Sequence, residues 1–124
     1  MASIEIGGDS GITTVDQSTY GGSEILNIDV LTSGASLTIT NTTDSTDVLD
    51  INQTIDVGAL SESTLNLEGS HVKMGSLAGV SAGSTFNYNL SNGASLDIDN
   101  GLLGVDVATT TNINMGDDST STFI

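Results

Sequence analysis

The sequence predicts an all-β protein, a β-solenoid (parallel β-helix) of about six short coils. Three observations support this fold class: apolar residues alternate with polar ones over short stretches, one turn motif recurs, and the 124-residue chain contains no proline. Because proline cannot donate a backbone hydrogen bond, its absence leaves every donor available to a sheet. The length suits one folding unit, so we expect a single β-repeat domain over residues 1–124.

Strict alternation of apolar and polar residues marks the expected strands. Residues 26–30, for example, read Leu-Asn-Ile-Asp-Val. Successive side chains of a strand point to opposite faces, so each such stretch is predicted to be a half-buried strand. The other stretches of this kind are Leu37–Thr40, Leu65–Glu68, Phe86–Leu90, Leu96–Asp99, Val105–Val107 and Ile113–Met115.

A degenerate motif of small and hydroxyl residues, usually with glycine, precedes four of the strands. It occurs at Ser33–Leu37, Ser61–Leu65, Ala82–Phe86 and Asn92–Leu96. Strand starts recur roughly every ten residues, so a two-strand coil of about twenty residues gives about six coils. Stacked coils place like residues above one another, so outward-facing Asn and Thr side chains are expected to hydrogen-bond in ladders.

Two alternatives to this arrangement stay open at the level of sequence. The same strand spacing fits a β-sandwich of short antiparallel strands. The segment with Val48, Leu49, Ile51 and Ile55 also fits one face of a helix, with Ser45 or Thr46 as its cap, although Asp and β-branched residues weaken that helix.

The charge balance restricts the partners that the chain can have. Sixteen Asp and Glu residues face one basic residue, Lys73, which gives a net charge of −15 at neutral pH. Nucleic acid and anionic membranes would repel such a chain, so cations are its natural counter-ions. No stretch is long and apolar enough for a transmembrane helix, and Met1–Glu5 lacks the basic and apolar regions of a secretory signal. There is no cysteine and therefore no disulfide or thiol chemistry.

No catalytic constellation can be recognised, so we do not expect an enzyme. His71 is the only histidine and lies near Ser70 and Lys73, but a serine–histidine pair also needs an orienting carboxylate and an oxyanion hole. We expect His71 to be a solvent-facing strand or turn residue. A hydrolase that uses paired carboxylates would need a cleft with aromatic platforms, and the aromatic residues amount to 3% of the chain.

The carboxylates suggest calcium as the one candidate ligand. Asp97 and Asp99 project from the same face of a predicted strand, and Asn87 with Asn89 in a neighbouring coil would complete a grid of oxygen ligands. A solvated polar face would have the same pattern. Residues 101–109 resemble the calcium-binding nonapeptide of RTX proteins, which implies Asp106 as a further ligand, but Leu102 replaces the second glycine and no adjacent copy follows.

The composition also resembles a group of secreted proteins. Strands rich in Ser, Thr, Asn, Gly and Asp with almost no Lys or Arg are similar to the β-helical regions of bacterial secreted adhesins and surface filament proteins. Residues 116–124 resemble the uncleaved C-terminal signal of type I secretion. A polar tail that ends in a docked strand would have the same composition. The resemblance implies an extracellular or cell-surface location and a structural role.

These observations predict an extracellular, self-assembling subunit of a filament or matrix whose main partner is another copy of the chain. An open solenoid ends in unpaired strand edges, here expected at Ser3–Ile6 and Thr120–Ile124. The apolar residues Ile4, Ile6, Phe123 and Ile124 would seal the contact between copies. The alternative is a calcium-stabilised adhesive module in which Asp97, Asp99 and Asp106 bind the ion and a flat polar face binds a cell surface or extracellular matrix.

Overall fold

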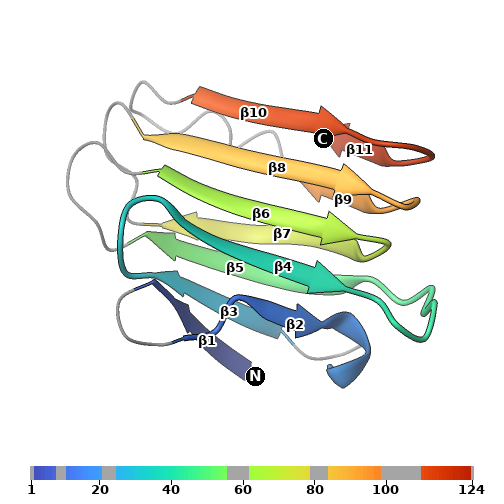
Figure 1. The fold of residues 1–124 in the computed structure, drawn as a ribbon, viewed down its shortest axis with the longest axis horizontal. Coiled ribbons are helices and arrows are strands. Elements are labelled where there is room, and N and C mark those ends of the chain that lie inside the picture. The colour runs from blue at the N-terminus through green and yellow to red at the C-terminus, as the bar shows by residue number, and fades with distance from the viewer. Residues whose placement is uncertain are drawn as a thin grey trace.

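The structure is a computed structural model that describes residues 2–7, 11–20, 25–55, 62–78, 84–98 and 110–123. Within these residues the regular elements are strands, apart from one short 3-10 helix, η1 (Gln17–Thr19) (Figure 1). The strands are β1 (Ala2–Ile6), β2 (Thr14–Asp16), β3 (Ile25–Val30), β4 (Ala35–Thr40), β5 (Leu49–Ile55), β6 (Glu62–Glu68), β7 (His71–Ala78), β8 (Thr85–Ser91), β9 (Ser95–Ile98), β10 (Thr110–Met115) and β11 (Thr120–Phe123).

The strands form two sheets with different numbers of strands. Sheet A has the order β1-β3-β5-β7-β9-β11, and sheet B has the order β10-β8-β6-β4-β2. Each described pairing is parallel, and successive described strands alternate between the two sheets. Figure 1 shows sheet B in front of sheet A, with the coils stacked from the blue N-terminal end to the red C-terminal end. The predicted β-solenoid is therefore confirmed, and the antiparallel sandwich is wrong.

The coils are fewer and longer than the sequence suggested. Leu49 pairs with Val72, 23 positions further along the chain, and Ala35 pairs with Ser63, 28 positions further along. The solenoid has about four turns instead of six. The complete coils are β3–β4, β5–β6, β7–β8 and β9–β10, with the short β2 in the coil before them and β11 after them. The prediction of about twenty residues per coil failed because it left too little chain for the corners between strands.

The recurring turn motif precedes strands, as expected. Equivalent residues of successive copies of the motif do not always pair with each other. Leu37 of the first copy pairs with Leu65 of the second, as equivalent positions should. Phe86 of the third copy pairs with Ser63 instead. The offset is two residues, which keeps every apolar side chain on its original face because the side-chain period of a strand is two.

The core lies between the two sheets and consists of columns of stacked apolar side chains. In sheet A, Leu26, Ile51 and Met74 follow one another in register, and all three are at most 2% exposed. Leu37 and Leu65 form a similar column in sheet B and are equally buried. Each such side chain contributes about 1.5–3 kcal/mol when it is withdrawn from water. No coil is thick enough to bury these residues alone, so stacking is what stabilises the fold.

Residues with unusual backbone conformations build the corners. Asn92 and Gly93 have φ angles of 54° and 75°, in the left-handed region that asparagine and glycine tolerate. They form the tight turn between β8 and β9, where the Ala94 N–H donates to the Ser91 carbonyl over 3.1 Å. A second irregularity is a bulge in β7 at Gly75, where a Cβ atom would lie 2.9 Å from Asn52 Oδ1.

The helix alternative for the segment around Leu49 is wrong, because residues 49–55 form β5. Leu49 and Ile51 face inward and are buried, whereas Asp50 is exposed. Gln53 occupies the next inward position, at 1% exposure, which hides the alternation in the sequence. Its Nε2 donates to Ser63 Oγ over 2.8 Å, and Tyr88 donates to its Oε1 over 3.4 Å. A polar residue is tolerated there because its amide is hydrogen-bonded.

Candidate assembly edges and polar faces

The first and last described strands form the two edges of the same sheet. β1 and β11 are the first and last strands of the six-stranded sheet A. Ile4 and Ile6, which the sequence assigned to the contact between copies, are 6% and 0% exposed, so they already pack in the core of the first coil. Phe123 is the last residue of β11 and pairs with Ile98. Ile124 lies outside the described residues.

The backbone at these edges is oriented for pairing with a further strand. The Thr120 N–H donates to the Ala94 carbonyl over 3.0 Å and thus points toward β9. The next residue in a strand points the other way, so the Ser121 N–H faces the open edge. At the opposite edge the Ile6 carbonyl accepts from the Leu31 N–H over 2.9 Å, which leaves the backbone groups of Ser3 and Glu5 facing outward.

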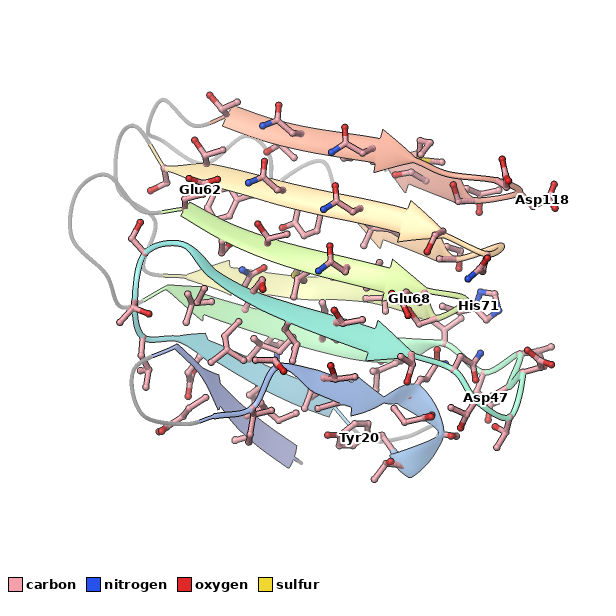
Figure 2. All side chains as sticks on the ribbon, viewed as in Figure 1. Tyr20, Asp47, Glu62, Glu68, His71 and Asp118 are labelled. Atoms are coloured by element: carbon pink, nitrogen blue, oxygen red, sulfur yellow. The ribbon has the colours of Figure 1, made fainter. Side chains whose placement is uncertain are left out.

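The outer face of sheet B carries two columns of uncharged polar side chains. They run across the strands in register, and we call them together the ladder face. Figure 2 shows these side chains projecting in regular rows along the sheet. One column consists of Ser36, Thr64, Asn87 and Asn112, and the other of Thr14, Thr38, Asn66, Asn89 and Asn114.

Hydrogen bonds connect successive coils along the ladder face. Asn89 Nδ2 donates to Asn66 Oδ1 over 2.9 Å, and Asn114 Nδ2 donates to Asn89 Oδ1 over 2.6 Å. In the parallel column Asn112 Nδ2 donates to Asn87 Oδ1 over 2.9 Å. Each amide therefore uses one N–H toward the coil on its N-terminal side, and all these bonds run in the same direction along the stack. The predicted asparagine ladders are confirmed.

Carboxylates lie at both ends of the ladder face, and one of them contacts it, because Asn87 Nδ2 donates to Glu62 Oε1 over 3.0 Å. Figure 2 shows Glu62 at one end of β6 and Glu68 at the other. Asp16 lies at the end of β2, where its Oδ1 accepts a 2.8 Å hydrogen bond from the Ser18 N–H. Hydrogen bonds from Ser18, and then from Thr42, hold the pKa of Asp16 well below its usual range. The charge next to this face is thus confined to its rims.

Sheet A presents a different outer face, which is acidic. Glu5 pairs with Asp29 on neighbouring strands, an arrangement that places two like charges opposite each other. Lys73 lies in register between Asp50 and Asp97. Lys73, which is the one Lys or Arg residue of the sequence, therefore lies between two carboxylates and reduces their repulsion.

The proposed calcium ligands are only partly covered by the structure. Asp97 is half-buried on β9 and pairs with Lys73 and Thr122 in sheet A. Asn87 and Asn89 lie on β8 in sheet B, so the expected grid of Asp97 with these asparagines is wrong. Asp99 and Asp106, together with the RTX-like segment, lie outside the described residues. Among the residues that are described, no three His, Asp or Glu side chains come together as a metal-binding group.

His71 lies at a corner of the solenoid, and it does not pair with Ser70. Its Nδ1 is 2.9 Å from Ser95 Oγ, and its backbone N–H donates to Gln17 Oε1 over 2.7 Å. Gln17 Nε2 also donates to the Asp47 carbonyl over 2.5 Å, so this buried side chain joins three successive coils. The half-buried His71 is the first residue of β7 and makes this corner contact, so it is a strand residue, as the sequence allowed, and is partly exposed to solvent.

Two buried hydroxyl groups lack hydrogen-bond partners in the described part of the chain. They are Ser70 Oγ, next to that corner, and Ser121 Oγ, on the edge strand β11. In contrast, the buried Tyr88 hydroxyl bonds to Gln53, and burial raises the pKa of Tyr88 above its ordinary value. A buried hydroxyl without a hydrogen-bond partner lowers the free energy of unfolding, so both serines are expected to destabilise the fold locally.

The difference between the two outer faces cannot be predicted from the sequence pattern alone. The strands alternate in the same way in both sheets, and the contrast emerges only when the register is known. The corner role of Gln17 cannot be predicted either, because a glutamine outside any periodic stretch carries no signal. No helix in the described part of the chain is long and apolar enough to cross a membrane.

Comparisons with known proteins give no relative. No family model matches the chain, and neither the curated proteins nor the solved structures include a match.

Proposed function

We propose that this protein is an extracellular structural subunit that assembles end to end into a filament or matrix. The observation that supports the proposal is that β1 and β11 form opposite edges of one parallel sheet, each with outward-facing backbone groups. An exposed sheet edge is a template for a further strand. Because the edges differ, the contact is heterologous and repeats without closing, which is the geometry of a fibre.

The strands themselves suggest the register of such a junction. Full overlap of the two strands places Thr120 opposite Ser3 of the next copy and Thr122 opposite Glu5. Phe123 then stands opposite Ile6, and Ser121 opposite Ile4. This register pairs an uncharged residue with Glu5, so no two carboxylates meet directly at the junction. The assignment of Ile4, Ile6 and Phe123 to the assembly contact is part of this proposal.

Sheet B does not continue through the same junction. Sheet A has six strands and sheet B five, so joining β11 to β1 leaves β10 two strand steps from β2 of the next copy. Met115, at 49% exposure, lies on that free edge of β10. The backbone of β10 is therefore not used in the junction, which provides an internal control.

The test compares proline substitutions at the two free edges. Ser121→Pro removes an outward N–H from β11, whereas Met115→Pro removes one from β10, where Gly116 N–H already donates to the Leu90 carbonyl. The purified chain is held at about 100 µM in 1 M NaCl, where the Debye length of about 3 Å screens its net charge. Electron microscopy and sedimentation should show filaments for the wild type and Met115→Pro, and monomers for Ser121→Pro.

Two results would contradict the proposal. The first is a wild-type chain that stays monomeric over the whole range of salt and protein concentration. The second is a folded Ser121→Pro variant that assembles as well as the wild type. Circular dichroism establishes that the variant is folded, and Thr120→Glu, which adds a charge at an exposed position of β11 without altering the backbone, serves as a second block.

A further inference from the structure

We propose that the ladder face is a lateral contact surface between copies of this chain, through which filaments associate side by side into bundles. This inference rests on the proposed end-to-end assembly, but it concerns a different surface. Its starting point is the distribution of charge: a chain with a net charge of −15 has an outer sheet face whose two central columns contain only Ser, Thr and Asn.

The charge distribution selects this face over the other one. Two copies that meet through sheet A would bring Glu5, Asp29, Asp50 and Asp97 against the same residues of the partner, with Lys73 as the only described cation there. Such repulsion and desolvation of carboxylates disfavour contact. Two ladder faces bring fewer carboxylates together, because Asp16 and Glu68 lie at one rim and Glu62, which accepts a hydrogen bond from Asn87, lies at the other.

The hydrogen-bonding groups of the ladder face are self-complementary. Asn66 and Asn89 each use one N–H along the stack, which leaves a second N–H and a carbonyl lone pair on each amide. Regular rows of such groups pair with an identical surface, as in the tight interfaces between sheets that carry asparagine ladders. An uncharged polysaccharide is the other chemical match, but the described residues of the ladder face include no aromatic side chain on which a sugar ring could stack.

The size of the surface explains why filaments are needed. With strands about 4.8 Å apart and a rise of about 3.3 Å per residue, the two columns cover about 300 Å² per copy. The roughly 600 Å² buried by two copies is below the approximately 1,200 Å² of a stable interface. Isolated copies should therefore not pair, whereas copies aligned along a filament add their weak contacts into a strong one.

The test places charge on one face or the other with matched substitutions. The face variant carries Asn66→Asp and Asn89→Asp, and the control carries Asn27→Asp and Asn52→Asp on sheet A. The face pair removes the 2.9 Å bond from Asn89 to Asn66 and the 3.3 Å bond from Asn66 to Thr38. The control pair removes the 3.1 Å bond from Asn52 to Asn27, and each pair adds two charges. Electron microscopy should show bundles for the wild type and the control, and single filaments for the face variant. Burying the added carboxylates is costly even in high salt, so the difference should persist at 1 M NaCl.

A second arm does not depend on filament growth. Wild type, control and face variant are coupled at high density to latex beads, which supply the multivalency directly. Beads with the wild type or the control should aggregate, and aggregation with the face variant should fall at least tenfold. If the face variant fails to fold, the single substitution Asn112→Asp on the exposed edge of the same face replaces it.

The outcomes separate this inference from the proposed function. Bead aggregation without filaments contradicts end-to-end assembly and supports the lateral contact. Bundles or bead aggregates that are equally abundant with the folded face variant overturn the lateral contact, whether or not filaments form. Binding to cellulose or dextran that the face variant loses, while its bundles remain, would assign the ladder face to a polysaccharide and also overturn the inference.

Discussion

Substitution of Asn89 by alanine tests how much the ladders contribute to the stability of the stack. Asn89 donates to Asn66 and accepts from Asn114, so the change removes two hydrogen bonds. A neutral hydrogen bond contributes about 0.5–1.5 kcal/mol, and the partial exposure of this face places each bond near the lower end. The expected loss is about 1 kcal/mol, which corresponds to a decrease in melting temperature of about 4 °C for a chain of this size.

Asn112 provides the matched control for this prediction. It lies on the last strand of sheet B and donates one hydrogen bond, to Asn87. Asn112→Ala should therefore cost about half as much as Asn89→Ala in urea or thermal unfolding followed by circular dichroism. Combining Asn66→Ala with Asn89→Ala should give a coupling energy of about 0.5 kcal/mol. Equal effects of Asn89→Ala and Asn112→Ala, or additive effects of the pair, would refute the view that the amides stabilise the stack through these bonds.

Four further changes test the core, the charges and the metal hypothesis. Ser70→Ala should raise the free energy of unfolding by about 1 kcal/mol, because it removes a buried hydroxyl without a partner among the described residues; a loss of stability would show that the hydroxyl is paired. The depressed pKa of Asp16 means that its contribution is complete above pH 4 and is lost as pH falls further, so Asp16→Asn should flatten the acid side of the stability profile. Asp29→Asn removes the repulsion from Glu5 and should stabilise the fold by about 0.2–1 kcal/mol at low salt but not at 1 M NaCl. The calcium hypothesis predicts a higher melting temperature at millimolar Ca²⁺ and a smaller increase for Asp97→Asn, whereas an unchanged wild-type melting temperature would contradict it.

Most of the strands could be predicted from the sequence because their side chains obey a period of two. Residues 26–30 and 86–90 alternate without exception, and both segments are strands. β5 was ambiguous for a physical reason: Gln53 faces the core and is satisfied by Ser63 and Tyr88, two residues that no local pattern connects to it. The expected strand at 105–107 lies outside the described residues.

The coil length and the surfaces could not be predicted in the same way. The corner at residues 41–48 contains Asn, Thr, Asp and Ser, whose side chains bond to the local backbone and give no periodic signal. For example, Asn41 Nδ2 donates to the Ser45 carbonyl, and Asn41 Oδ1 accepts from the Ser45 N–H. Without the corner lengths the register is unknown, and without the register the separation of an uncharged face from an acidic one cannot be seen.

Crosslinking through introduced cysteines measures the proposed junction most directly, because the natural chain contains none. Glu5→Cys and Thr122→Cys are combined in one chain and oxidised under assembly conditions. The two positions lie at opposite edges of a six-stranded sheet, about 24 Å apart within one copy, whereas a disulfide requires Cα atoms within about 7 Å.

Any bond between the two cysteines must therefore join different copies. End-to-end assembly through β1 and β11 predicts a ladder of covalent oligomers on a denaturing gel without reductant, and no species larger than a dimer for either single substitution. A doubly substituted, folded chain that yields only monomers and dimers would contradict end-to-end assembly through β1 and β11.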